Sequence, residues 1–230
     1  MRIAVVVFDG FDELDAIGPL EVLRNAATMG GVDLEVDLVA LGGAAEVTGS
    51  HGLRIRPDGP LDPQRTDLLV IPGGGWNDRA PQGARAEAER GELPAAIAAA
   101  AEAGAVVATV CTGAMLATAA GLTRGRPAVT HHGAIEDLRA AGAQVVEARV
   151  VDDGDLVTAG GVTSGIDMAL WLVERHFGAA LAEAVAAEIA HPRHGEVWRG
   201  WARAASRSLR TRRDSLGQAG TTGAYVGEEP

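Results

Sequence analysis

Residues 105–122 read AVVATVCTGAMLATAAGL, and this stretch decides the fold. Its first six residues form an apolar, β-branched run of the length of a buried strand, and a helical pattern begins at Gly113. Cys111 lies at the junction between the two. The arrangement is that of a nucleophile elbow, a sharp strand-to-helix turn that holds a nucleophile over the edge of a sheet.

Other apolar runs of similar length lie on either side, at residues 3–8, 34–41, 67–75 and 156–161. Helical patterns alternate with them, at Gly18–Met29, Glu92–Ala103, Gly133–Ala141 and Ile166–Phe177. This alternation predicts an α/β fold, a doubly wound and mostly parallel sheet with helices on both faces, whose ligands bind at the carboxyl ends of the strands. Further β structure is predicted as a hairpin over 46–56 and as a pair formed by 144–151 and 156–159.

The composition excludes several classes of protein. The 230 residues include 31 acidic and 20 basic side chains, all of the latter arginine, which argues against a general binder of nucleic acid or of anionic membranes. The single cysteine rules out an intramolecular disulfide and a cysteine-rich zinc site. No apolar run reaches about 18 residues, and Ile3–Val7 is too short for the core of a signal peptide, so we expect a cytoplasmic protein without a membrane span.

The end of the chain differs in composition from the rest. We expect one domain over residues 1–216 that includes an arginine-rich terminal helix, followed by a disordered tail over 217–230. Four arginines recur there at helical spacing, Arg199, Arg203, Arg207 and Arg210. We interpret this segment as a surface helix that packs on the acidic body or on a partner subunit, because no companion helix and turn of a DNA-reading motif accompanies it.

Cys111 has two interpretations from spacing alone. Backbone N–H groups at the start of the following helix stabilise a thiolate, so we expect the pKa of the Cys111 thiol to be lowered, as a nucleophile needs. The alternative is a buried structural thiol. The turn Pro72–Gly75, PGGG, ends the neighbouring predicted strand and leaves backbone N–H groups unshielded, where an oxyanion-type donor is wanted.

Two carboxyl groups near the N-terminus are candidate acids. Asp15 lies among Leu14, Ala16 and Ile17, in apolar surroundings that raise the pKa of a carboxyl group. Its alternative role is to cap the following helix. Glu21, one turn into that helix, is the other candidate.

Several segments together resemble the ThiJ/PfpI superfamily, which has the class I glutamine amidotransferase-like, flavodoxin-like fold, and most of all its isocyanide hydratase (isonitrile hydratase) branch. They are VCTGAMLATAAGL, PGGG, LDAIGPLEV, RPAVTHHG, TAGGVTSGIDMALWLVE and SLRTRRDSL, and they run from near the N-terminus to about residue 216. Ligand-sensing domains of AraC-type regulators share nearly all of these segments, but those regulators continue into a helix-turn-helix module.

The resemblance implies roles for particular residues. Cys111 corresponds to the nucleophile and Asp15 to the acid hydrogen-bonded to it, and the two are expected to share a proton as a coupled pair. Thr112 and Gly74 would supply donors around the site. Thr112 stands where peptidase-like branches have a histidine, so a Cys-His dyad of adjacent residues is absent.

The pocket is less well defined by the resemblance. His131 matches a TH pair of the family, with a structural histidine as the alternative, and His132 replaces a common aromatic neighbour. Glu21 and Gly161 are the other residues that we expect near the pocket. We expect no metal site, because the three-residue spacing of His191 and His194 has no acidic companions of suitable arrangement.

The resemblance implies hydration of an isocyanide to an N-substituted formamide without a cofactor, through a Cys111 thioimidate with Asp15 as the acid. A glyoxalase or deglycase acting on methylglyoxal is the alternative enzyme, although such members usually have Glu where this chain has Asp15. A small-molecule or redox sensor that uses reversible oxidation of Cys111 is the non-enzymatic alternative. The resemblance also implies a homodimer that takes a small-molecule substrate.

Overall fold

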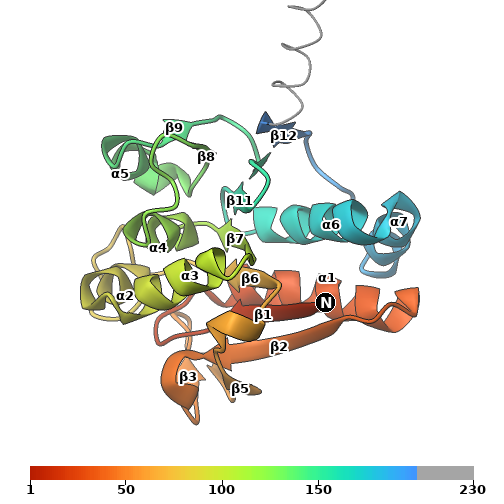
Figure 1. Cartoon of the computed structure of the whole chain (residues 1–230), viewed down its shortest axis with the longest axis horizontal. Helices are drawn as coiled ribbons and strands as arrows, with labels where there is room; N and C mark the ends of the chain where they lie inside the picture. The colour runs from red at the N-terminus through yellow and green to blue at the C-terminus, as the bar shows by residue number, and fades with distance from the viewer. Residues whose placement is uncertain (201–230) are drawn as a thin grey trace, which may run out of the picture.

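The computed structural model describes residues 1–200 of the 230. Its centre is an eight-stranded sheet (Figure 1). The order is β12 (Val197–Arg199), β10 (Val150–Asp152), β11 (Leu156–Ala159), β7 (Val106–Val110), β6 (Leu68–Ile71), β1 (Arg2–Val6), β2 (Glu35–Ala40) and β5 (Gly59–Pro60). Neighbouring strands are parallel except β10 and β11, which confirms the predicted mostly parallel α/β sheet.

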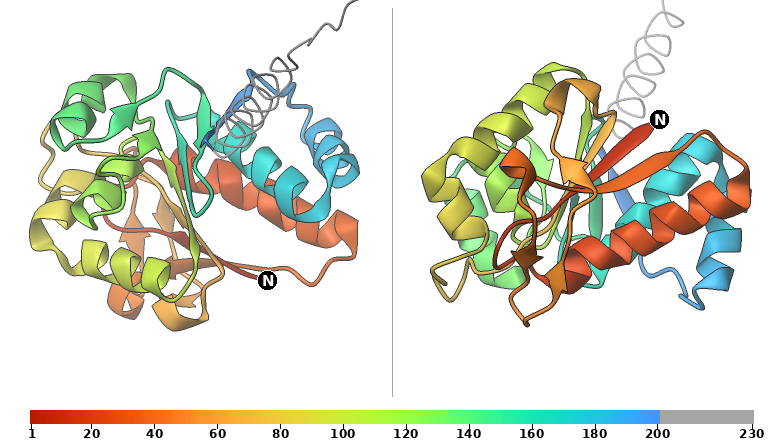
Figure 2. Two further views of the ribbon diagram at one scale, coloured as in Figure 1. Left: turned by 45° about the horizontal axis from the view of Figure 1, so that its top comes forward. Right: turned by 90° about the horizontal axis from the view of Figure 1, so that it is seen from below.

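Helices cover both faces of this sheet, as the views in Figure 2 show. One layer contains α1 (Glu13–Gly30), α6 (Ser164–Phe177) and α7 (Ala179–Glu188), and the other contains α2 (Ala84–Arg90), α3 (Glu92–Glu102) and α4 (Gly113–Ala119). Apolar side chains of the central strands are buried between the layers. Gly165 allows a close approach, because a Cβ there would lie 3.0 Å from Val110 and 3.2 Å from Pro19.

Shorter elements complete the described chain. The predicted hairpin is present as β3 (Val47–Thr48) and β4 (Arg54–Ile55). A small outlying unit contains β8 (Pro127–Ala128), η3 (His132–Ala134), α5 (Ile135–Ala140) and β9 (Gln144–Val145), with a minor core of its own. Two further 3-10 turns are η1 (Leu41–Gly43) and η2 (Pro63–Arg65).

Some predicted boundaries are wrong. The helix expected from Gly18 begins at Glu13, because the side chain of Asp12 accepts a hydrogen bond from the Leu14 N–H and caps it. The single strand expected over 144–151 is two strands, of which β9 pairs with β8 and only β10 pairs with β11. Helices α2 and α7 were not predicted.

The C-terminal prediction is only partly within the described residues. Arg199 belongs to strand β12, paired in parallel with β10, and not to a helix. The other arginines of the predicted helical face and the predicted tail over 217–230 lie outside the described residues. Among residues 1–200, no helix is long and apolar enough to cross a membrane.

Candidate active site

Three loops meet at the carboxyl ends of the adjacent strands β1, β6 and β7, where the fold predicts a ligand site. The Asp12 N–H donates to the Gly73 carbonyl oxygen over 2.8 Å and joins the first loop to the second. The Gly74 N–H donates to Thr112 Oγ1 over 3.0 Å and joins the second loop to the third. The start of α1, the PGGG turn and the Cys111 turn are therefore held as one unit.

Cys111 occupies the turn between β7 and α4 in a left-handed backbone conformation, with φ of 57°. Such a conformation is unfavourable for a residue with a side chain and persists only where neighbours fix it. Here the Cys111 N–H donates to the Ala159 carbonyl over 3.0 Å, and the Thr130 hydroxyl donates to the Cys111 carbonyl over 2.9 Å. These two hydrogen bonds hold the backbone of Cys111 in its unfavourable conformation at the end of β7.

Two glycines let the loops pack this closely. A Cβ on Gly113 would overlap the carbonyl oxygens of Ile71 and Pro72, and a Cβ on Gly73 would overlap Thr112. Backbone atoms are the obstacles at Gly113, so the neighbours cannot move aside as a flexible side chain would. Only glycine fits at the start of α4 without displacing the end of β6.

Asp15 lies in the first turn of α1 and is completely buried. The Gly73 N–H donates to Asp15 Oδ2 over 2.9 Å, and among the described residues the other oxygen, Oδ1, accepts no hydrogen bond. The side chains of Asp15 and Cys111 interact with each other. Asp12, and not Asp15, caps the helix. The Asp15 carboxyl group is therefore left to interact with Gly73 and Cys111.

Both groups bind their protons more tightly than usual. The pKa of Asp15 is raised to about 8, first by burial and then by the charge of Asp12, although the Gly73 N–H and Cys111 oppose this. The pKa of the Cys111 thiol is also raised, first by burial and then by the charge of Asp15, although the Thr112 N–H opposes this. The expected lowering of the thiol pKa is therefore wrong, because burial outweighs the helix start. Both shifts favour the uncharged forms of the two side chains at neutral pH.

Thr112 is buried beside Cys111 and its hydroxyl accepts the Gly74 N–H. The family resemblance implied that Gly74 donates toward the substrate. In this arrangement its N–H is instead used by Thr112, and Gly74 positions that side chain. Because the hydroxyl accepts from Gly74, its own proton remains able to donate to another group.

The remaining predicted residues have different surroundings. His131 Nδ1 lies 3.2 Å from Asn77 Nδ2 and accepts the Gly133 N–H, so Nε2 carries the proton of the neutral ring. The pKa of His131 is lowered, first by burial and then by His132. Gly161 follows β11, and a Cβ there would meet nothing within 4 Å.

Glu21 is exposed on α1 and accepts a hydrogen bond from the Asn25 side chain. Asp15 is fully buried and interacts with the thiol, so the acid beside Cys111 is Asp15. The pocket role expected for Glu21 stays a prediction.

An open groove lies beside the start of α1, with a volume of about 520 Å³. It is lined by Asp12, Glu13, Leu14, His51, Leu53 and Val162. Glu13 holds one wall in place, because its carboxylate accepts the His51 N–H over 2.7 Å and lies 2.6 Å from His51 Nδ1. Leu14 and Leu53 are exposed apolar side chains in this groove.

Sequence reasoning missed these groove residues and Thr130, and it did not link the Gly73 N–H to Asp15. Gly73 and Thr130 lie next to residues that the motifs did single out, but their roles depend on contacts with Asp15 and Cys111 that are distant in the chain. No periodicity or spacing indicates such contacts.

The sequence and the fold match a known family. The sequence profile of the DJ-1/PfpI family matches residues 1–175. The chain belongs to the DJ-1/PfpI family. This confirms the resemblance that the motifs indicated.

Individual relatives give the same result. The chain is 36% identical over 186 residues to an isonitrile hydratase from Pseudomonas putida, which covers 80% of this chain and 76% of the relative. It is 31% identical over 162 residues to a deglycase from Thermococcus kodakarensis, over 69% of this chain and 89% of that one. The crystal structure of a ThiJ/PfpI family protein from Pseudomonas syringae superposes with a TM-score of 0.70 at 28% identity, covering 84% of this chain and 76% of the other. The family thus includes enzymes with different substrates.

Proposed function

We propose that this protein is an isocyanide hydratase, which adds water to an isocyanide and releases an N-substituted formamide without a cofactor. The observation that carries the proposal is Asp15, a fully buried carboxyl group with a pKa of about 8 beside the Cys111 thiol. A group with this pKa is protonated at neutral pH and close to the value at which an acid catalyst both holds and releases a proton. Similarity to the Pseudomonas putida isonitrile hydratase supports the same assignment.

The first half of the proposed reaction adds the thiol across the isocyanide carbon. Asp15 donates its proton to that carbon, which becomes electrophilic, and Cys111 Sγ forms a bond to it. The thiol proton passes to the Asp15 carboxylate as the bond forms. The product is a thioimidate on Cys111, and Asp15 is protonated again.

The second half consumes water. Asp15 donates its proton to the thioimidate nitrogen and accepts one from the attacking water, so that oxygen bonds to the carbon. The carbon–sulfur bond then breaks as the new hydroxyl group loses its proton to form the formamide carbonyl, and sulfur recovers a proton through Asp15. One water is consumed and both side chains return to their uncharged forms.

The chain's fixed groups favour these steps. The Gly73 N–H stabilises the Asp15 carboxylate that forms transiently, over a hydrogen bond that exists before the reaction. The Thr112 hydroxyl is available to donate to the substrate nitrogen as it gains electron density. The groove that contains Leu14, Leu53 and Val162 offers apolar surface for the substituent of the isocyanide.

Product identification tests the proposal. The purified protein is incubated with an aryl isocyanide and, separately, with methylglyoxal, and the products are identified by proton NMR. We expect the formamide from the first and no lactate from the second. Lactate without formamide would support the alternative enzyme, a glyoxalase or deglycase, and would overturn the proposal. The absence of both products would also overturn it and favour a sensing role.

A further inference from the structure

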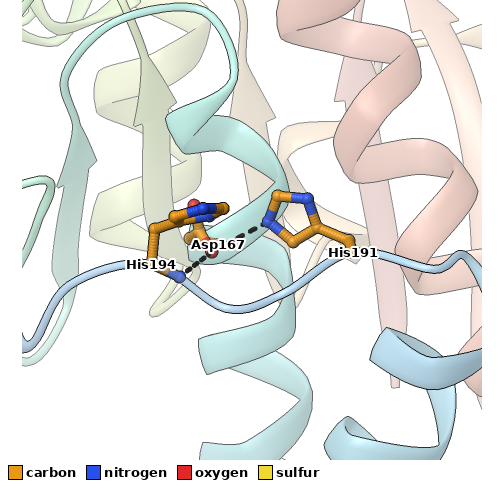
Figure 3. A group of neighbouring side chains, drawn as sticks. All are labelled: Asp167, His191 and His194. Atoms are coloured by element: carbon orange, nitrogen blue, oxygen red, sulfur yellow. Dashed lines mark hydrogen bonds and ion pairs between the residues drawn. The ribbon is translucent and has the colours of Figure 1, made fainter.

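A group of three side chains lies away from the Cys111 site, at the start of α6. It consists of Asp167 in the first turn of that helix and of His191 and His194 in the connection between α7 and β12 (Figure 3). One ligand atom of each of the three residues lies within 4.8 Å of those of the other two. The sequence pointed to the two histidines but not to Asp167, because the carboxylate lies 24 residues before the nearer histidine.

Asp167 is the centre of the group, and its carboxylate is nearly inaccessible to solvent. Oδ1 lies 3.0 Å from His191 Nε2 and accepts the backbone N–H of His194 over 2.9 Å. Oδ2 is occupied by Arg149, whose Nε lies 2.5 Å away. The two oxygens are therefore divided, one toward the histidines and the other toward the arginine.

We propose that Asp167, His191 and His194 bind a divalent transition-metal ion such as Zn²⁺. Imidazole nitrogen together with carboxylate oxygen is a donor set that suits zinc, and three protein ligands leave one tetrahedral position for water. Zinc bonds of about 2.0–2.1 Å place neighbouring ligand atoms about 3.3 Å apart in a tetrahedral site, close to the separation of Asp167 Oδ1 and His191 Nε2.

His194 closes the site by rotating its side chain. Its imidazole is exposed and lies edge-on to the His191 ring, with the ring centroids 5.3 Å apart, whereas its backbone is fixed by the N–H bond to Asp167. Arg149 remains on Oδ2 as an outer partner and also donates to Thr163 Oγ1 over 2.9 Å, so it orients the carboxylate. Bound metal would tie the segment that leads to β12 to the start of α6.

The competing explanation is that Asp167 is only an ion-pair and hydrogen-bond acceptor. The variant His194→Ala separates the two, because it removes one metal ligand and keeps the backbone N–H that Asp167 accepts. The matched control is His176→Ala, which removes an exposed imidazole of α6 outside the group. Asp167→Asn is less informative, because it also alters the contact with Arg149.

The experiment measures Zn²⁺ binding by isothermal titration, with the visible spectrum of the Co²⁺-substituted protein as the geometric readout and Tm with and without chelator as the folding readout. We expect one Zn²⁺ per chain in the wild type and in His176→Ala, a raised Tm, and tetrahedral Co²⁺ bands. We expect His194→Ala to weaken Zn²⁺ binding by at least about 100-fold, which is the upper end of the effect of losing an outer-shell partner. In the presence of chelator, its Tm should equal that of the wild type. Absence of Zn²⁺ binding in the wild type, or equal affinity in His194→Ala, would overturn the proposal.

Discussion

The backbone N–H of Gly73 donates a hydrogen bond to Oδ2 of Asp15 over 2.9 Å, across 58 residues of sequence. This bond connects the turn after β6 to the first turn of α1 and holds a fully buried carboxyl group beside Cys111. Burial nevertheless dominates, and the pKa of Asp15 stays near 8. The Gly73 N–H is thus already placed to stabilise the Asp15 carboxylate, although burial favours the protonated carboxyl group.

The pKa of Asp15 predicts how activity depends on pH. The protonated carboxyl group is the active form, so kcat/KM for isocyanide hydration should be level below neutrality and fall above about pH 8. Because Asp15 and Cys111 are coupled, the value that the profile reports is the first macroscopic pKa of the pair. Initial rates between pH 5 and about pH 10 check this. A rate that increases through pH 8 would show that the ionised pair is the active form.

The raised pKa of the Cys111 thiol predicts that the thiol ionises at a higher pH than an ordinary cysteine. Because Cys111 is the only cysteine, thiolate absorbance in the ultraviolet follows it directly, with Cys111→Ser as the blank. We expect the midpoint of the wild type to lie above the ordinary thiol value of 9.0 and that of Asp15→Asn to lie lower, since the substitution removes a negative charge. A wild-type midpoint below the ordinary value would restore the interpretation in which the helix start dominates.

Thr112 should act through its hydroxyl group. Thr112→Ser keeps the acceptor for the Gly74 N–H and a donor for substrate, and we expect it to retain most of the activity. Thr112→Val keeps the shape and loses both, so we expect kcat to fall by about tenfold or more, on the scale of a lost charge-assisted hydrogen bond. Steady-state kinetics of the two variants compare them directly. Equal rates for Ser and Val would remove Thr112 from the mechanism.

The close packing at the turn predicts a difference between two glycines. Gly113→Ala places a Cβ against the backbone of Ile71 and Pro72, and we expect it to lower the free energy of unfolding by about 1–3 kcal/mol or more. Gly161→Ala meets nothing within 4 Å and should change that free energy by less than about 0.5 kcal/mol. Denaturant unfolding of both variants measures the two values. Similar losses in both would contradict the packing described for the turn.

The sequence was a good guide to the fold and a partial guide to the site. The parallel sheet was predicted from the strand–Cys111–helix pattern and from the alternation of apolar runs with helical patterns, because those signals are local in the chain. The Gly18-Pro19 pair misplaced the start of α1, since a proline usually marks a first turn, whereas Asp12 caps the helix and Pro19 lies inside it.

The electrostatics of the site could not be read in the same way. The start of α4 favours a thiolate, but the larger effects are burial and the charge of Asp15, which exist only in the folded chain. For the same reason the histidines at 191 and 194 lacked an acidic partner in the sequence, although folding brings Asp167 to them.

The proposed hydration requires Asp15 and Cys111 to act together. Asp15→Asn keeps the shape and removes the transferable proton, so its turnover should fall by two or more orders of magnitude, and Cys111→Ser should be comparably damaging. The double variant should lose little more than either single one, because groups that act as a unit are not additive. Glu21→Gln, on the exposed side of α1, is the control and should remain near wild type.

The most direct measurement is the rate of formamide formation from one aryl isocyanide, followed by proton NMR for the wild type and these four variants. We expect rapid formation in the wild type and Glu21→Gln, and a loss of at least about 100-fold in Asp15→Asn, in Cys111→Ser and in the double variant. Near wild-type formation by Asp15→Asn, or loss of activity in Glu21→Gln alone, would contradict it.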